Sequence, residues 1–271
     1  SSTATITMQQ KQPGLIYLLP LLVVISAVAY YVFYIQEDPD VQPELTYSPI
    51  VRGNTYFHRV VTRNLERIIQ ATKHIKKHAD EWPQERRESL YSHLLEVMNA
   101  IEIHHGQEEE TMWADLEKFL PEFKEQTEGL RAEHKVLVDA IAKVREAKLN
   151  VNEADDVSTM KDLASAVLVV FKAHCEHEEE ALVEKDAMEK IPKEDGERIV
   201  KALVKYAKDN DATGAQLPLV YYSQTVEERD IMFKRMPWFV KNIILKYFMW
   251  SKYKNYAEFY PHHSSSSSFK L

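Results

Sequence analysis

Four histidines, one on each of four predicted helical segments, have the spacing and surroundings of metal ligands. They are His58, His104, His134 and His174. Two of them are followed four residues later by a glutamate, so that His104 pairs with Glu108 and His174 with Glu178. Residues i and i+4 lie on one face of an α-helix, and each pair therefore directs an imidazole and a carboxylate toward one point. Four imidazoles and two bridging carboxylates suffice to hold two metal ions.

The two glutamates lie on faces that are otherwise apolar, which is unfavourable without a partner. Glu108 follows Leu90, Leu94, Val97, Ile101 and His104 at steps of three or four residues. Glu178 continues a similar series in its own segment. A buried carboxylate is expensive unless it is paired or bound to a metal. A lone histidine on such a face is more often a hydrogen-bonded core residue, but four histidines in phase with four apolar stripes favour a metal centre.

The composition of this donor set favours iron. A structural zinc site would take four ligands, usually with thiolates among them, whereas imidazole and bridging carboxylate suit two five- or six-coordinate ions. We therefore expect two non-haem iron ions, with manganese as the second choice. Each would take two histidines and share both glutamates, with an oxo or hydroxo bridge. The remaining positions would accept a small ligand such as O₂ or NO inside a dry shell.

Polar neighbours of these residues have a different interpretation. The flanking acids are expected to form a solvated surface or to hydrogen-bond the ligands from outside; they are Glu109, Glu110, Glu179 and Glu180. His105 and His177 lie beside predicted ligands but off the best stripe, so we assign them to outer hydrogen bonds or to the surface. Three further histidines lack a carboxylate at ligand spacing on their own faces: His74, His78 and His93.

Four long amphipathic segments must position the donors. Apolar residues recur every three or four positions over residues 52–79, 84–118, 122–148 and 156–189. Trp82-Pro83, Pro121 and the Asn150/Asn152 pair separate them. Long helices joined by short connections predict an all-α, up-down-up-down four-helix bundle over residues 51–190.

The chain before the bundle predicts a membrane anchor. Residues 1–13 form a polar N-terminal tail, and residues 14–35 contain no charge. At about 1.5 Å per residue this stretch reaches about 33 Å, enough to cross the hydrocarbon core as a transmembrane helix. A cleaved signal peptide is the alternative, but the stretch is long for one and no small-x-small cleavage site follows. Residues 36–50, with three prolines, are a linker.

Charge next to the apolar stretch suggests an orientation. Lys11 precedes it, and Glu37, Asp38, Asp40 and Glu44 follow it. The positive-inside rule then places the N-terminus inside and the bundle on the outer face of the membrane, which is periplasmic, intermembrane or lumenal.

The region after the bundle, residues 191–261, is predicted to form amphipathic and aromatic helices. One helix is expected at about 194–208. Residues 218–260 mix aromatic and aliphatic residues with lysines, which suits a helix lying in a membrane interface. Packing against the bundle or a partner subunit explains the same composition equally well. Residues 262–271, with a run of serines, are expected to be a disordered tail.

Composition excludes some classes of function. The net charge is −8, and the absence of a long basic run argues against nucleic acid as a partner. The single cysteine, Cys175, excludes an internal disulfide framework. There is neither a dinucleotide fingerprint nor a cysteine cluster for an iron–sulfur centre, so an internal electron donor is not evident.

The four amphipathic segments resemble the hemerythrin HHE cation-binding family. The resemblance covers about residues 50–190 and rests on FHRVV, HHGQEEETMW, AEHKVL and HCEHEEEAL. It implies a four-helix bundle with a non-haem di-iron centre whose ligands are His58, His104, Glu108, His134, His174 and Glu178. The chain departs from the oxygen-carrying members, which have a further histidine one turn after the third helix ligand, where this chain has Val138. Fewer protein ligands leave a more open centre, which favours sensing or reactivity.

Three functions follow. The first is a membrane-anchored di-iron protein that binds O₂ or NO for sensing, delivery or protection, with the lipid bilayer as its other partner. The second is an accessory subunit of a larger membrane complex, such as a respiratory one, with the bundle as a metal-binding scaffold. The third is a redox enzyme, such as a ferroxidase or a peroxide- or NO-consuming activity, which would need electrons from a partner.

Overall fold

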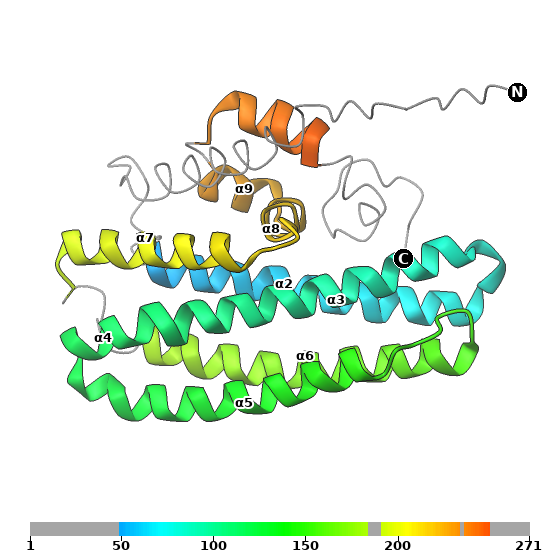
Figure 1. Ribbon diagram of the computed structural model, residues 1–271, viewed down its shortest axis with the longest axis horizontal. Coiled ribbons are helices and arrows are strands. Elements are labelled where there is room, and N and C mark those ends of the chain that lie inside the picture. Colours follow the sequence, from blue (N-terminus) through cyan, green and yellow to red (C-terminus); the bar gives the residue numbers. More distant parts are fainter. Residues whose placement is uncertain (1–48, 184–190, 234–235, 250–271) are drawn as a thin grey trace, which may run out of the picture.

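The computed structural model describes residues 49–183, 191–233 and 236–249 (Figure 1). Within these ranges the chain is helical and contains no strand, as the sequence predicts. The predicted tail, transmembrane helix at 14–35 and nearly all of the linker lie outside the described residues, as does the C-terminal tail. Among the helices that are described, none combines the length and apolar character that a membrane crossing requires.

Four antiparallel rods form the main body (Figure 1). The first is α2 (Pro49–Lys77), which begins inside the segment expected as linker. The second is built from α3 (Gln84–Gln107), the π-helical turn η4 (Glu108–Met112) and α4 (Trp113–Phe119). The third and fourth are α5 (Lys124–Glu146) and α6 (Ala154–Val183). Contacts join α2 to α3 and α6, and α5 to α3 and α6, so the rods close into a bundle.

Local sequence ends and starts these rods. Pro83 precedes α3 as its N-cap, and Pro121 opens the short 3₁₀ turn η5 (Pro121–Phe123) before α5. Proline suits these places because its missing N–H would have no helical partner there. After α5 the chain turns at Lys148, whose φ of 44° lies in the left-handed region that terminates helices. A further 3₁₀ turn, η3 (Ala79–Glu81), follows α2.

The interior consists of two apolar clusters with a polar layer between them. The larger cluster includes Val61 and Ile68 of α2, Leu94 of α3, and Ile141 and Phe171 of α5 and α6. The smaller occupies the opposite end and includes Met112, Trp113, Leu116, Leu130 and Leu182. On every rod, the predicted ligands fall between residues of the two clusters. Apolar burial on both sides therefore holds the polar layer at one level of the bundle.

A second layer covers one side of the bundle. It contains α7 (Lys193–Asn210), α8 (Gln216–Ser223), α9 (Val226–Met232) and the π-helical η6 (Val240–Met249). The expected helix at 194–208 corresponds to α7, which contacts α3, η4 and α2. Of the two interpretations of residues 218–260, packing on the bundle holds for part of the segment. Met232, Phe233, Val240 and Leu245 form a buried cluster with Tyr56 of α2.

Candidate metal centre

The structure brings all six predicted ligands together in the polar layer. Each is at most 4% exposed. They fall into two groups whose candidate ligand atoms lie within 4.8 Å of one another. One group holds His58, His104, Glu108 and Glu178, and the other holds Glu108, His134, His174 and, in addition, His105. Glu108 belongs to both groups, which is the position of a bridging carboxylate.

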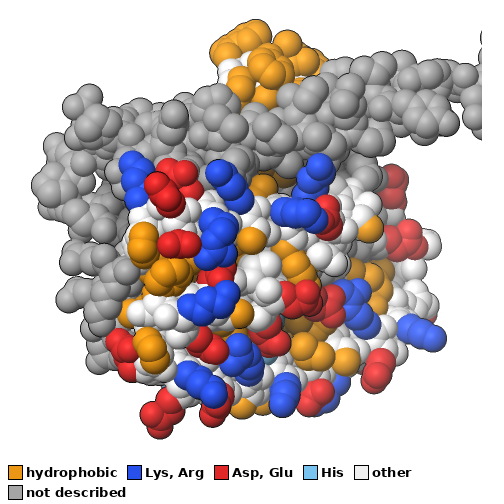
Figure 2. All heavy atoms as spheres, turned by 60° about the vertical axis from the view of Figure 1, so that its left-hand side comes forward, with side chains coloured by type: hydrophobic (Ala, Val, Ile, Leu, Met, Phe, Trp, Pro, Cys, Tyr) orange, Lys and Arg blue, Asp and Glu red, His pale blue; other side chains and the backbone are white. Residues whose placement is uncertain are grey.

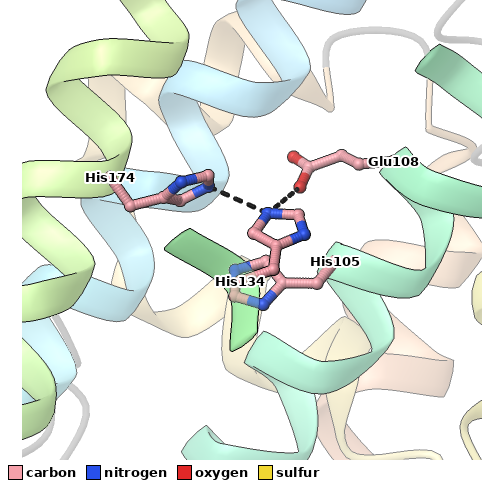
Figure 3. A group of neighbouring side chains, drawn as sticks. All are labelled: His105, Glu108, His134 and His174. Atoms are coloured by element: carbon pink, nitrogen blue, oxygen red, sulfur yellow. Dashed lines mark hydrogen bonds and ion pairs between the residues drawn. The ribbon is translucent and has the colours of Figure 1, made fainter. Parts of the chain in front are cut away.

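The histidines face each other in two pairs. The Nε2 atoms of His58 and His104 lie 3.2 Å apart, and those of His134 and His174 lie 3.1 Å apart. Glu108 divides its oxygens between the pairs, with Oε1 2.8 Å from Nε2 of His104 and Oε2 3.3 Å from Nε2 of His134. Figure 3 shows Glu108 reaching from its helix toward the His134 and His174 rings. Glu178 Oε2 lies 3.2 Å from Nε2 of His58.

Acidic side chains hold the far nitrogens of three histidines. Nδ1 of His58 lies 2.8 Å from Glu179, and Nδ1 of His134 lies 2.7 Å from Glu109. Nδ1 of His174 lies 3.0 Å from a carboxylate oxygen of Glu133. A carboxylate at Nδ1 favours the tautomer that has its proton there and leaves the Nε2 lone pair for a metal. Of the two alternatives for the flanking acids, outer hydrogen bonding to the predicted ligands holds for Glu109 and Glu179.

Sequence reasoning missed Asn54, which lies one turn before His58 on α2. Its Nδ2 donates to Glu108 Oε1 at 3.2 Å and to Glu178 Oε1 at 3.1 Å. One amide therefore orients both central carboxylates and leaves their other oxygens directed at the histidines. The i, i+4 spacing of Asn54 and His58 is the signal that could have identified it.

Burial and charge act in opposite directions on the two glutamates. Burial and the neighbouring carboxylate of Glu178 raise the pKa of Glu108 well above its ordinary value. Burial also raises the pKa of Glu178, but the combined interactions with His58, His174 and His104 outweigh burial and lower the pKa overall. The buried carboxylates of Glu108 and Glu178 belong to the same group and repel each other when both are charged. A cation between them would relieve that repulsion.

The unpartnered atoms of the layer match a metal site. Oε2 of Glu108, Oε2 of Glu178 and both ring nitrogens of His105 are buried without a hydrogen bond. Buried polar atoms normally find a partner, and leaving one without costs about 1–3 kcal/mol. These atoms converge on the two groups, and the donors are nitrogen and oxygen with no thiolate. The residues therefore fit iron or manganese better than structural zinc.

His105 is buried in the polar layer, whereas from the sequence we assigned it to outer hydrogen bonds or to the surface. It is only 4% exposed and its ring stacks on that of His134, with centroids 3.8 Å apart. The surface alternative for His105 is therefore wrong. Its position was detectable, because it follows Ile101 by four residues and precedes Glu108 by three. His177, by contrast, is exposed and contacts Glu133, the same carboxylate that holds His174.

Position 138, where the oxygen-carrying members have a further histidine, faces away from the layer. The Val138 side chain is 49% exposed.

A third, smaller group of potential donors lies at the other end of α2. His74, His78 and Glu81 approach within 4.8 Å, and His78 Nδ1 is 3.3 Å from Glu81 Oε1. The expectation that these histidines lack a carboxylate at ligand spacing is thus wrong for His78. Trp82 Nε1 donates to Nδ1 of His74 at 2.9 Å, so one nitrogen of that ring is already engaged. This group is far more exposed than the polar layer.

Comparison with known proteins agrees with this geometry. The family model of the hemerythrin HHE cation binding domain matches residues 55–185, which include all six predicted ligands. Neither the curated proteins nor the solved structures gave a significant match.

Proposed function

We propose that this chain, which over residues 55–185 belongs to the hemerythrin HHE cation-binding family, is a membrane-anchored non-haem di-iron protein that binds O₂ or NO. Binding would serve sensing, delivery or protection. The observation that carries the proposal is the sharing of Glu108 by two groups of buried donors, in which Oε2 of Glu108 and Oε2 of Glu178 lack hydrogen bonds. A single carboxylate placed between two histidine pairs is suited to two ions rather than one.

The chain's own residues prepare this layer for ions and a small ligand. Glu179, Glu109 and Glu133 fix three imidazoles so that Nε2 faces the centre. Three aromatic rings line the layer and limit water. They are Phe57 at 4.2 Å from His104, Trp113 at 4.7 Å from His134 and Phe171 at 5.8 Å from His58, measured between ring centroids. Ferrous ions held there would supply the electrons for inner-sphere binding of a diatomic molecule.

Iron content and absorption test this function. Purified protein should contain about two iron ions per chain. Its near-ultraviolet and visible absorption should bleach on anaerobic reduction, return with O₂ and change with NO. Little iron after anaerobic reconstitution with ferrous ion would contradict the di-iron assignment. Two ions with no spectral response to either gas would contradict ligand binding while leaving the metal site intact.

Membrane anchoring is part of the same proposal and rests on two separate features. The sequence provides the uncharged segment 14–35. The structure contributes an apolar outer face on η6 and the residues before it, where Trp238 is 71% and Tyr247 68% exposed, next to the exposed Phe239 and Ile243. Figure 2 shows hydrophobic side chains standing at the top of the molecule, where Figure 1 places η6, whereas the end of the bundle facing the viewer carries interspersed acidic and basic groups. Aromatic residues of this kind favour the membrane interface.

The same exposed face favours one alternative function, an accessory subunit that docks on a membrane complex. Extraction of the membranes distinguishes the anchored di-iron protein from the accessory subunit. An integral anchor leaves the full chain in the membrane pellet after alkaline carbonate and releases it as a small particle in mild detergent. Constant recovery in one large complex, together with substoichiometric iron, would favour the accessory subunit instead.

A further inference from the structure

His105 is a buried imidazole for which the protein provides no hydrogen-bond partner. It is 4% exposed, and neither Nδ1 nor Nε2 has a hydrogen bond. A ring nitrogen without a hydrogen-bond partner in the protein is available to a metal ion.

Its place in the chain directs it to the second group of donors. His104 and His105 are consecutive on α3, and Glu108 follows them by four and three residues. Residues three and four apart are neighbours on a helix surface, so the Glu108 carboxylate is adjacent to both histidines. His104 belongs to the group with His58, and His105 to the group with His134 and His174, while Glu108 belongs to both. The two adjacent histidines thus belong to different groups, and both groups share Glu108. Figure 3 shows His105 and Glu108 with His134 and His174.

Contacts from α7 restrain the backbone next to His105. Gly106 lies against the ring of Tyr206 on α7, and a Cβ at position 106 would collide with that ring. Gln107 Nε2 donates to the carbonyl of Leu203 at 2.7 Å, and the π-helical turn begins at Glu108. π-Helical turns inside α-helices are frequent at functional sites. Tyr206 and Leu203 therefore restrain the position of the segment that contains His105 and Glu108.

A purely structural role explains His105 less well. The ring stacks on His134 and lies edge-on to His174, with centroids 5.3 Å apart. Phenylalanine could make the same stack without burying two unpartnered nitrogens, which is unfavourable. His93, also fully buried on α3, has its Nε2 2.9 Å from Asn64 Oδ1. The interior of this bundle thus provides a hydrogen bond for one structural histidine and none for His105.

We propose that His105 is a seventh protein ligand, to the ion held by His134, His174 and Glu108. This inference rests on the proposed di-iron centre. Two imidazoles that bind one ion direct their lone pairs at a common point, so binding would require the His105 ring to turn out of its parallel stack on His134. The two ions then differ. One has three histidines and Glu108, and the other has His58, His104, Glu108 and Glu178. The nitrogen-rich set favours the ferrous ion more than the carboxylate-rich set does.

Two substitutions at position 105 and one elsewhere test this ligand. His105→Phe keeps a ring for the stack but has no donor atom, whereas His105→Glu supplies a carboxylate donor. His93→Phe on the same helix is the control for removal of a buried histidine. Each protein is reconstituted anaerobically, dialysed against a chelator, and compared by bound iron, Mössbauer spectroscopy and thermal melting in the metal-free form.

The expected result is specific to one ion. His105→Phe should retain about one iron per chain instead of about two, and should lose one of two distinct Mössbauer signals. His105→Glu should restore the second ion, and His93→Phe should keep both. The metal-free melting temperature shows whether each variant is folded. Two tightly held ions with unchanged Mössbauer signals in His105→Phe would overturn the proposal. Absence of two ions in the unaltered protein would instead overturn the proposed di-iron function.

Discussion

Two buried polar clusters on the same helices differ in how far other protein groups satisfy their hydrogen-bonding atoms. In the first, His93 of α3 lies 2.9 Å from Asn64 Oδ1, and Asn64 Nδ2 donates to Ser223 Oγ and to the Val60 carbonyl, each at 2.7 Å. All these groups are neutral and come from α2, α3 and α8. In the second, the metal-site layer, buried carboxylate oxygens and the His105 nitrogens remain without hydrogen bonds.

The difference separates a structural polar cluster from a binding site. A network whose members bond one another fixes the packing of its helices and needs nothing further. A network that converges on unpartnered lone pairs, with two carboxylates side by side, is unfavourable until a cation enters. Substitutions in the first cluster should therefore change stability without changing metal content. Substitutions in the second should change metal content, and should lower stability only through the loss of bound metal.

The largest effect is expected from Glu108→Gln. Because both groups of donors share Glu108, this variant should lose most of its iron and with it about 3–4 kcal/mol of metal-linked stabilisation at saturating ferrous ion. In metal-free protein the same change removes a buried carboxyl group whose charge is disfavoured beside Glu178, so melting should occur at an equal or higher temperature. Iron analysis and melting with and without chelator measure both. Retention of two ions would refute the bridging role.

Asn64→Ala should give the next largest effect, and only on stability. It removes the acceptor of His93 and the donor to Ser223, which leaves buried polar atoms unpaired at about 1–3 kcal/mol each. Denaturant unfolding of the metal-free protein measures this loss. Iron content should be unchanged after reconstitution, and a loss of iron would mean that the two clusters are coupled.

Glu109→Ala should weaken the metal site without destroying it. Glu109 holds Nδ1 of His134, and loss of such an outer partner typically lowers metal affinity by about 10–100-fold. Competition with a chromophoric chelator measures the affinity. Glu110→Ala is the matched control, since Glu110 accepts from Tyr206 Oη and contacts no predicted ligand. Equal affinities for the two variants would show that the Glu109 bond does not tune the centre.

The smallest effect is a pH dependence that belongs to the structural cluster. Burial lowers the pKa of His93 to about 3, whereas the unfolded chain takes up a proton near pH 6.5. Below that pH the unfolded state binds the extra proton, so stability falls on acidification by about 1.4 kcal/mol per pH unit. Comparing metal-free wild type with His93→Gln between about pH 7 and pH 5 isolates this contribution. Parallel pH profiles would show that His93 is protonated in the folded state.

The match to the HHE family model over residues 55–185 and the helical fold were predictable because their signals are local. Apolar stripes gave the helices, and proline gave their starts at Pro83 and Pro121. In-phase histidines predicted that His58, His104, His134 and His174 would share one layer, which the structure confirms. Their role as iron ligands stays a prediction, as do the membrane segment and its orientation.

Other features of the site required the packed structure. Nothing in the sequence indicated that Glu133 of α5, rather than an acid next to His174, would hold His174. The role of Asn54 and the burial of His105 depend on how α2 and α3 face the other helices. The π-helical turn at Glu108 also alters which side chains of that rod face inward.

The sequence alone therefore determined which residue types can bind metal and the helical faces on which they lie, because helix periodicity acts within a few residues. Tertiary structure decided how the donors divide into two groups, which carboxylate the groups share and which imidazoles are left without partners. Those properties depend on side chains from four rods meeting between two apolar clusters, and packing over long sequence separations fixes that meeting.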